Sequence, residues 1–306
     1  MDASITYIHC KPASFMSKMI QSFMALVGMK NDIEKKMKKK KFSQEAAPIP
    51  SSLKNKFDLI TTEINGRRIW TFKPKQNVSK KVILYLHGGA YILNITKYHW
   101  NLIEELLHKT NATIIVPDYP LAPSASCTNV YKFVEVVYNE LLFDIPSQNM
   151  IFMGDSAGAG IALGFAQELR NKNKTNPSQI ILLSPWIDIS MSNSAIIEFD
   201  KKDKILDTKG LQMAGEAYAG IVETKDFRVS PIYGNFSGLG KISVFIGAHD
   251  ILIADTKKLE DRLKQENIPI NYFEYPKMFH VWAIITVLPE SQHAINQMAL
   301  LLKDEN

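Results

Sequence analysis

Short apolar runs alternate with stretches of helical spacing, and this alternation constrains the fold more than any other feature of the chain. The runs are Val82–Leu86, Thr113–Val116, Met150–Met153 and Ile180–Leu183. Apolar residues recur with helical spacing between them, at about 98–109, 128–142 and 157–171. Strands that are apolar along their whole length are typical of parallel sheets covered by helices on both faces. The pattern therefore predicts an α/β fold.

Further runs extend the expected sheet on both sides. Phe57–Ile64 and Arg68–Phe72 are joined by Asn65-Gly66, a preferred two-residue hairpin turn, and this predicts an antiparallel edge. Two later strands are expected at Ile242–Ile246 and Ile270–Tyr275. Helices are expected at 253–266 and 290–303. In total we expect about eight strands, mostly parallel.

Two segments fall outside this alternation. In residues 1–50, apolar side chains from Phe15 to Val27 lie three and four positions apart, which predicts an amphipathic helix. Almost sixty residues without a clean strand follow Leu183, too many for an ordinary connection. We expect residues 51–306 to form the main domain. Residues 1–50 and an insertion at about 188–238 would then form a helical cap over the carboxyl ends of the strands, where open α/β sheets bind ligands.

Composition excludes several classes of protein. The chain has 306 residues, 46% hydrophobic and 22% charged, which is typical of a globular domain. It lacks both a run of roughly 20 apolar residues and the order of a signal peptide. Cys10 and Cys127 stand apart from each other and from any His/Cys cluster, which argues against disulfides and structural zinc. We expect a cytoplasmic protein that inserts stably into no membrane and needs no metal or cofactor.

Much of the net charge of +5 comes from one lysine cluster between Asn31 and Phe42. The cluster consists of Lys35, Lys36, Lys38, Lys39, Lys40 and Lys41. We expect a solvated helix face or a loose connector. The alternatives are attraction to nucleic acid or to anionic lipid. Because no aromatic residues are interleaved with the lysines, no nucleic-acid partner is expected.

The chemistry-bearing motif is Gly154-Asp155-Ser156-Ala157-Gly158, which lies between a predicted strand and a predicted helix. This G-x-S-x-G order predicts a nucleophile elbow, a strained turn that exposes the serine. The residues two positions either side must be small, and glycines at 154 and 158 meet that need. The pattern indicates that Ser156 is a candidate nucleophile.

A serine nucleophile needs a base to take its proton and an acid to orient that base. His280 follows the last predicted strand, at the carboxyl ends where Ser156 also emerges, and it is the favoured base over His249 and His293. Asp250 follows another strand and is the favoured acid. Its rival Asp255 is expected in the next helix, with a surface or helix-dipole role. The chain order serine, aspartate, histidine is that of α/β-hydrolases.

Backbone amides near the elbow would stabilise a developing oxyanion. His87-Gly88-Gly89-Ala90 follows the strand Val82–Leu86, and its two glycines allow close approach of the backbone to a ligand. We expect the donors to be the N–H groups of Gly88, Gly89 and Ala157.

Four ordered motifs together resemble the hormone-sensitive-lipase-like group of α/β-hydrolases, the bacterial family IV esterases. They are His87–Tyr91, Asp118–Pro123, Gly154–Gly158 and Ser184–Asp188, and the resemblance covers roughly residues 80 to 285. It implies a Ser156/Asp250/His280 triad, an oxyanion hole at Gly88, Gly89 and Ala157, and a cap built largely from the N-terminal segment. The family's pattern differs at Ala90, Pro120, Ser124 and Val281.

The expected function is hydrolysis of small, short-acyl carboxylic esters through an acyl-enzyme, and the resemblance is compatible with a homodimer. Deacetylation or amide hydrolysis with the same triad is an alternative. A second alternative is a ligand-binding homologue that has lost turnover, although such relatives typically lack the histidine that this chain has at position 280. A third is a peripheral membrane lipase attracted to lipid by the lysine cluster.

Overall fold

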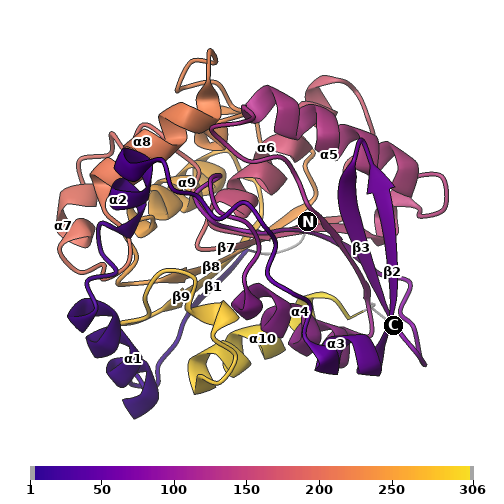
Figure 1. The fold of residues 1–306 in the computed structure, drawn as a ribbon, viewed down its shortest axis with the longest axis horizontal. Coiled ribbons are helices and arrows are strands. Elements are labelled where there is room, and N and C mark those ends of the chain that lie inside the picture. The colour runs from indigo at the N-terminus through magenta and orange to yellow at the C-terminus, as the bar shows by residue number, and fades with distance from the viewer. Residues whose placement is uncertain (1–3, 304–306) are drawn as a thin grey trace.

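The computed structural model describes residues 4–303, which form a nine-stranded sheet with helices on both faces (Figure 1). The strands are β1 (Ile5–Ile8), β2 (Phe57–Ile64), β3 (Arg67–Pro74), β4 (Val82–Leu86), β5 (Thr113–Pro117), β6 (Met150–Asp155), β7 (Gln179–Leu183), β8 (Lys241–Gly247) and β9 (Ile270–Tyr275). Their order in the sheet is β1-β9-β8-β7-β6-β4-β5-β3-β2. Only the pairings of β2 with β3 and of β3 with β5 are antiparallel. The mostly parallel α/β sheet expected from the sequence is confirmed.

The helices lie on the two faces of the sheet. The longer ones after the hairpin are α4 (Lys97–Thr110), α5 (Cys127–Leu141), α6 (Ala157–Asn171), α9 (Ile253–Gln265) and α10 (Pro289–Leu301). Figure 1 shows α5 and α6 on one face and α4 and α10 on the other, beside the short α3 (Ser51–Lys56). These boundaries lie within two residues of the expected helices, because each helix has a well-defined apolar stripe.

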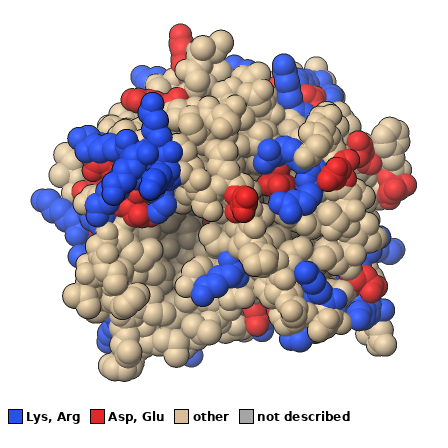
Figure 2. Space-filling model, in the orientation of Figure 1, with Lys and Arg blue, Asp and Glu red and all other residues tan. Residues whose placement is uncertain are grey.

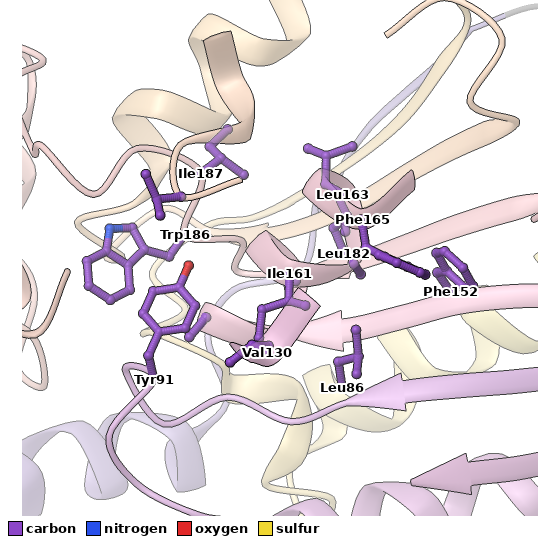
Figure 3. Packing of buried hydrophobic residues seen from close by; sticks show 14 of the residues in the cluster. Leu86, Tyr91, Val130, Phe152, Ile161, Leu163, Phe165, Leu182, Trp186 and Ile187 are labelled. Atoms are coloured by element: carbon purple, nitrogen blue, oxygen red, sulfur yellow. The ribbon is translucent and has the colours of Figure 1, made fainter. Parts of the chain in front are cut away.

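Alternate side chains of the central strands point into two separate apolar cores. Phe152 and Leu182 belong to the core beneath α5 and α6 (Figure 3), where Phe152 packs with its ring centre 5.6 Å from that of Phe165. Ile151 and Ile181 belong to the core on the α4 and α10 face. This arrangement explains why the sequences of these strands are apolar throughout and do not alternate between apolar and polar residues.

The count of about eight strands was too low, because β1 was not expected. The segment 1–50 was predicted to be helical, yet Ile5–Ile8 pairs in parallel with β9 at the edge of the sheet. Only four residues long, this strand leaves Ile5 and Ile8 exposed, so it lacks the apolar alternation that marks a strand in sequence. The N-terminal segment therefore contributes to the main sheet as well as to the region above it.

Two N-terminal helices and two from the chain between β7 and β8 lie near the carboxyl ends of the strands. They are α1 (Phe15–Leu26), α2 (Asp32–Lys39), α7 (Ile196–Asp200) and α8 (Thr208–Ala219). Helix α2 packs closely on α8, since a Cβ atom on Gly210 would lie 2.8 Å from the backbone nitrogen of Glu34. The division of the chain into a cap at 1–50 and about 188–238 and a main domain at 51–306 stays a prediction.

Polar contacts fasten α1 to the body of the protein. Glu290, in the first turn of α10, accepts hydrogen bonds from Ser14 N–H at 2.5 Å and Ser14 Oγ at 3.0 Å. It also accepts one from Ser17 Oγ at 3.3 Å. Gln21 Nε2 donates to the carbonyl of Lys277 at 3.0 Å. Among residues 4–303, no helix is long and apolar enough to cross a membrane.

Replacing the Glu290 carboxylate should loosen the start of α1. Glu290 is 4% exposed, so Glu290→Ala leaves the half-buried N–H and Oγ donors of Ser14 without this acceptor. We expect the free energy of unfolding to fall by about 1–3 kcal/mol, measured by urea denaturation. Glu266→Ala, which removes an exposed partner of Arg262, should change it by less than about 0.5 kcal/mol. Equal losses for the two variants would contradict the anchoring role of Glu290.

Candidate active site

The turn at Ser156 is held by close backbone packing. Strand β6 ends at Asp155 and α6 begins at Ala157, and Ser156 between them has φ 52° and ψ −120°. A Cβ atom on Gly158 would lie 2.0 Å from the carbonyl oxygen of Leu86, and one on Gly154 would lie 2.6 Å from that of Gly158. Larger residues at 154 and 158 would therefore clash with backbone, and the strained serine conformation is maintained by its surroundings.

The three side chains expected to react together do lie in contact. His280 Nε2 is 2.9 Å from Ser156 Oγ, and His280 Nδ1 is 2.9 Å from Asp250 Oδ2. Asp250 is fully buried, Ser156 is 5% exposed and His280 is 9% exposed. If Asp250 accepts the proton on Nδ1, Nε2 is free to accept from the serine hydroxyl. The geometry allows His280 to remove the Ser156 proton; the catalytic roles stay predictions until tested.

Burial and charge have opposite effects on His280. Burial lowers its pKa, but the charge of Asp250 and the hydrogen bond to Asp250 raise it, and the resulting pKa lies above the ordinary value of 6.5. The charges of Asp203 and Asp155 act in the same direction. The imidazolium that forms when His280 takes a proton is thereby stabilised.

The other candidates for the base and the acid have different hydrogen-bond partners. His249 Nδ1 lies 3.2 Å from Gln21 Oε1, and His293 contacts Tyr275 and Tyr7. Asp255 lies in the first turn of α9, where a helix-dipole role was expected, but it is 1% exposed, so the alternative surface role was wrong. It accepts a hydrogen bond from Asn193, and burial raises its pKa to about 6. Sequence spacing could not reveal this, because Asp255 is covered by residues of the segment between β7 and β8.

One expected oxyanion donor is already occupied. Gly88 N–H donates to Asp155 Oδ1 at 2.9 Å, so the assignment of Gly88 as a donor was wrong. The amides of Gly89 and Ala157 have no partner among the hydrogen bonds of the described residues, and the same is true of Ala90. Gly89 and Ala90 have φ values of 125° and 52° and both line the pocket at Ser156. Ala90 therefore replaces Gly88 among the candidate donors.

Asp155 links the serine turn to the loop after β4, a role that the sequence reading missed. Its carboxylate accepts hydrogen bonds from Tyr85 Oη at 2.6 Å and from Gly88 N–H, and it lies 3.2 Å from His99 Nε2. Thr96 N–H donates to His99 Nδ1, which leaves the proton on Nε2 facing Asp155. Burial alone would raise the pKa of Asp155, but His99 and these donors hold it below its ordinary value. The loop that carries the candidate amides is thus fixed relative to Ser156.

A second buried carboxylate that the sequence reading missed lies beside the Asp250–His280 pair. Asp203 accepts from the N–H groups of Ile205 and Leu206 at 2.8 and 2.9 Å, and from Ile251 N–H at 2.8 Å. Burial and then the charge of Asp250 raise the pKa of Asp203 to about 6. Asp203 therefore ties the segment before α8 to the turn that carries Asp250.

An apolar pocket of about 300 Å³ opens onto Ser156 and His280. Its wall is shared by distant parts of the chain: Met24, Met29 and Ile33 come from the N-terminal segment, and Ile205 and Leu206 from the segment before α8. Most of the lining is apolar, and the polar residues that line it besides Ser156 and His280 are Thr96, Tyr98, His99 and Asp155.

Hydrogen bonds stabilise the backbone at two departures from the family pattern, Val281 and Pro120. Val281, with φ 51°, donates its N–H to Ser184 Oγ at 3.0 Å. Near Pro120, the Arg67 side chain donates to the carbonyl oxygens of Asp118 and Tyr119. Hydrogen bonds from Arg67 thus hold the turn at which the family's usual arginine is missing. Within residues 4–303, no group of three or more His, Cys, Asp or Glu side chains is arranged to hold a metal ion.

Comparison with known proteins agrees with this geometry. The sequence model of a family described as alpha/beta hydrolase fold matches residues 83–284. An esterase from Acinetobacter venetianus is 29% identical over 232 residues, which cover 73% of this chain and 75% of that protein. An acetyl-hydrolase from Streptomyces hygroscopicus is 29% identical over 225 residues, with the same two coverages. A solved esterase structure from the bacterial hormone-sensitive lipase family has a TM-score of 0.77 at 20% identity, over 96% of this chain and 92% of that one.

Because the pKa of His280 is raised, we expect a specific pH dependence of the reactivity of Ser156. A serine-directed fluorophosphonate should react only when His280 is neutral, so the labelling rate should have its midpoint above pH 6.5 and fall about tenfold per pH unit below it. Asp203→Asn removes a charge that raises the pKa of His280 and should move the midpoint to lower pH. The remote Asp226→Asn should leave it unchanged. A wild-type midpoint below pH 6.5 would contradict the prediction.

Proposed function

This chain belongs to the alpha/beta hydrolase family, and we propose that it is a serine carboxylic-ester hydrolase that acts on small, short-acyl esters through an acyl-enzyme. The family match over residues 83–284 and the related esterase from Acinetobacter venetianus support the resemblance to hormone-sensitive-lipase-like esterases. The observation that carries the proposal is the pair of 2.9 Å contacts that connect Ser156, His280 and Asp250 at the base of an apolar pocket.

In the proposed reaction, Ser156 Oγ attacks the ester carbonyl while His280 Nε2 takes the hydroxyl proton. Asp250 holds His280 in the required tautomer and stabilises the imidazolium. Collapse of the tetrahedral intermediate breaks the bond to the alcohol, which leaves with the proton from His280. Water then attacks the acyl-enzyme with His280 again as base, and the acid and free Ser156 are released.

Charge on the substrate oxygen would be stabilised by backbone amides. Gly89 and Ala90 line the pocket together with Ser156, and Ala157 follows Ser156 directly as the first residue of α6. The positive end of the α6 dipole therefore adds to the effect of the individual hydrogen bonds. The hydrogen bond between Asp155 and Gly88 holds the loop of Gly89 and Ala90 in a fixed position relative to Ser156.

The pocket supports a small and uncharged substrate. Its volume of about 300 Å³ is at the lower end of ligand pockets, and neither lysine nor arginine is among its lining residues. A charged acyl or alcohol group would lose its hydration there without compensation. A short acyl chain attached to an apolar alcohol fits both the size and the lining.

The relatives support the same reaction class and a specific acyl group. One is called an esterase and another an acetyl-hydrolase. The pocket volume and the acetyl-hydrolase relative therefore both favour removal of an acetyl group from a small molecule. Amide hydrolysis with the same residues is the alternative. A silent ligand-binding homologue is less well supported, because His280 is present and in contact with Ser156.

Hydrolysis of p-nitrophenyl esters of increasing acyl length tests the proposal. We expect acetate and butyrate to react faster than decanoate, with Ser156→Ala lowering kcat by at least about a thousandfold. Both proteins should have the same circular dichroism spectrum, which controls for misfolding. Activity that survives Ser156→Ala would refute the nucleophile, whereas ligand binding without turnover in the wild type would favour the silent homologue.

The assignment of the acid is tested by comparing two aspartates. Asp250→Asn should lower kcat by about a thousandfold or more, because the histidine would lose its orienting acceptor. Asp255→Asn keeps the shape of a side chain that does not contact His280, and should lower kcat by less than about tenfold. The reverse ranking would transfer the role of acid to Asp255.

A further inference from the structure

Helix α1 presents a broad apolar surface to the outside of the molecule. Its outward side chains include Phe15, Met16, Met19, Phe23 and Leu26, of which Leu26 is 84% exposed and Phe15 is 78% exposed. Lys18 is the only charged residue of the helix. Single exposed apolar residues are ordinary, but a contiguous patch on one helix marks a contact surface.

This exposure does not come from a loosely attached helix. Ser14 caps α1 through Ser17 N–H, and Glu290 and the carbonyl of Lys277 hold the helix from two sides. The face that carries Ser17 and Met24 is the buried one. The opposite face is therefore held outward by fixed contacts, with its large apolar side chains in water.

Helix α2 and the residues after it carry an excess of positive charge next to α1. Lys36 and Lys38 form ion pairs with acidic residues of the same helix. Among residues 4–303, Lys35, Lys39, Lys40 and Lys41 have no carboxylate partner, and all four are exposed. These unpaired cations form an electrostatic surface that favours an anionic partner.

The apolar and the basic surfaces flank the mouth of the pocket. Met24 of α1, Met29 of the connecting turn and Ile33 of α2 all line the pocket at Ser156. Figure 2 shows lysines gathered over α2 and its neighbours, a hollow beside them, and an uncharged surface over α1 on the other side of the hollow. A partner that covered both surfaces would therefore lie across the entrance to the site.

We propose that α1 and the four unpaired lysines at positions 35, 39, 40 and 41, in and just after α2, form a docking face for an anionic lipid surface. The apolar side chains of α1 enter the boundary between headgroups and acyl chains, and the lysines contact the anionic headgroups. The pocket mouth then faces the lipid, so that esters dissolved in it can reach Ser156; this last step rests on the proposed function, whereas the docking does not. The contact is peripheral, since α1 has only 12 residues.

Charge favours lipid over a second copy of the chain as the occupant. A twofold dimer buries the same patch of both subunits, so pairing through α1 would bring two lysine clusters toward the same interface. Like charges at such an interface cost free energy. An anionic bilayer satisfies the apolar and the basic surface together.

Vesicle binding by the Ser156→Ala protein tests the proposal without any dependence on hydrolysis. The full chain is sedimented with phosphatidylcholine vesicles, with or without 30 mol% phosphatidylglycerol, at low and at moderate salt. We expect binding to the anionic vesicles that weakens as salt is raised. Absence of binding at low salt would overturn the proposal, even if the wild type hydrolyses esters.

Two paired variants locate the contact. Phe23→Ser with Leu26→Ser, and Lys39→Glu with Lys40→Glu, should each lower the partition coefficient by at least about tenfold. Matched controls change exposed residues that do not line the pocket: Phe143→Ser with Ile221→Ser, and Lys80→Glu with Lys109→Glu. Equal loss in the controls would show unspecific attraction and overturn the assignment to α1 and α2.

A spectroscopic readout shows whether α1 enters the lipid. All four tryptophans of the chain are buried, so the exposed indole introduced by Phe23→Trp gives a distinguishable signal. We expect its emission to shift to shorter wavelength on anionic vesicles and to be quenched by brominated lipid. A shift that occurs without vesicles as protein concentration rises, together with dimer formation in sedimentation velocity, would assign the α1 surface to a second copy and overturn the proposal.

Discussion

The site depends on the close approach of two neighbouring strands at their carboxyl ends. Glycines at 154 and 158 let the serine turn come within contact of the backbone at Leu86 and His87. The carboxylate of Asp155 then crosses the same gap to bond Gly88 N–H. Ser156 follows β6, whereas the candidate oxyanion amides of Gly89 and Ala90 follow β4, so their alignment exists only while this contact holds. A sheet with larger side chains at the two glycines could not form it.

Much of the fold could be predicted from the sequence because the central strands are apolar throughout and the helices have clear stripes. Val82–Leu86 and Met150–Asp155 are recognisable without any knowledge of their neighbours. Strand β1 was missed for the opposite reason: Ile5 and Ile8 are exposed, and its position depends on backbone pairing with β9. Pairing of this kind leaves no periodic signal in a strand of four residues.

The residues of the candidate site fall into the same two groups, those that the sequence could predict and those that it could not. Ser156, Asp250 and His280 were predictable because each follows a strand, and the topology brings the carboxyl ends of parallel strands together. Gly88 was misassigned because its sequence motif does not show that Asp155 already accepts from its amide. Asp203 lies in an irregular segment, and its place beside Asp250 results from packing between parts of the chain 47 residues apart, which no local pattern encodes.

The pocket wall has a consequence for how such a protein can diversify. Met24, Met29 and Ile33 belong to the N-terminal segment, whereas Ser156, Asp250 and His280 all follow strands of the central sheet. Part of the pocket wall thus comes from a stretch of polypeptide that carries none of the candidate catalytic residues. Exchange of residues 20–40 between homologues would change this part of the pocket wall and leave the candidate catalytic residues in place, which makes this short stretch the natural unit for recombination or directed evolution.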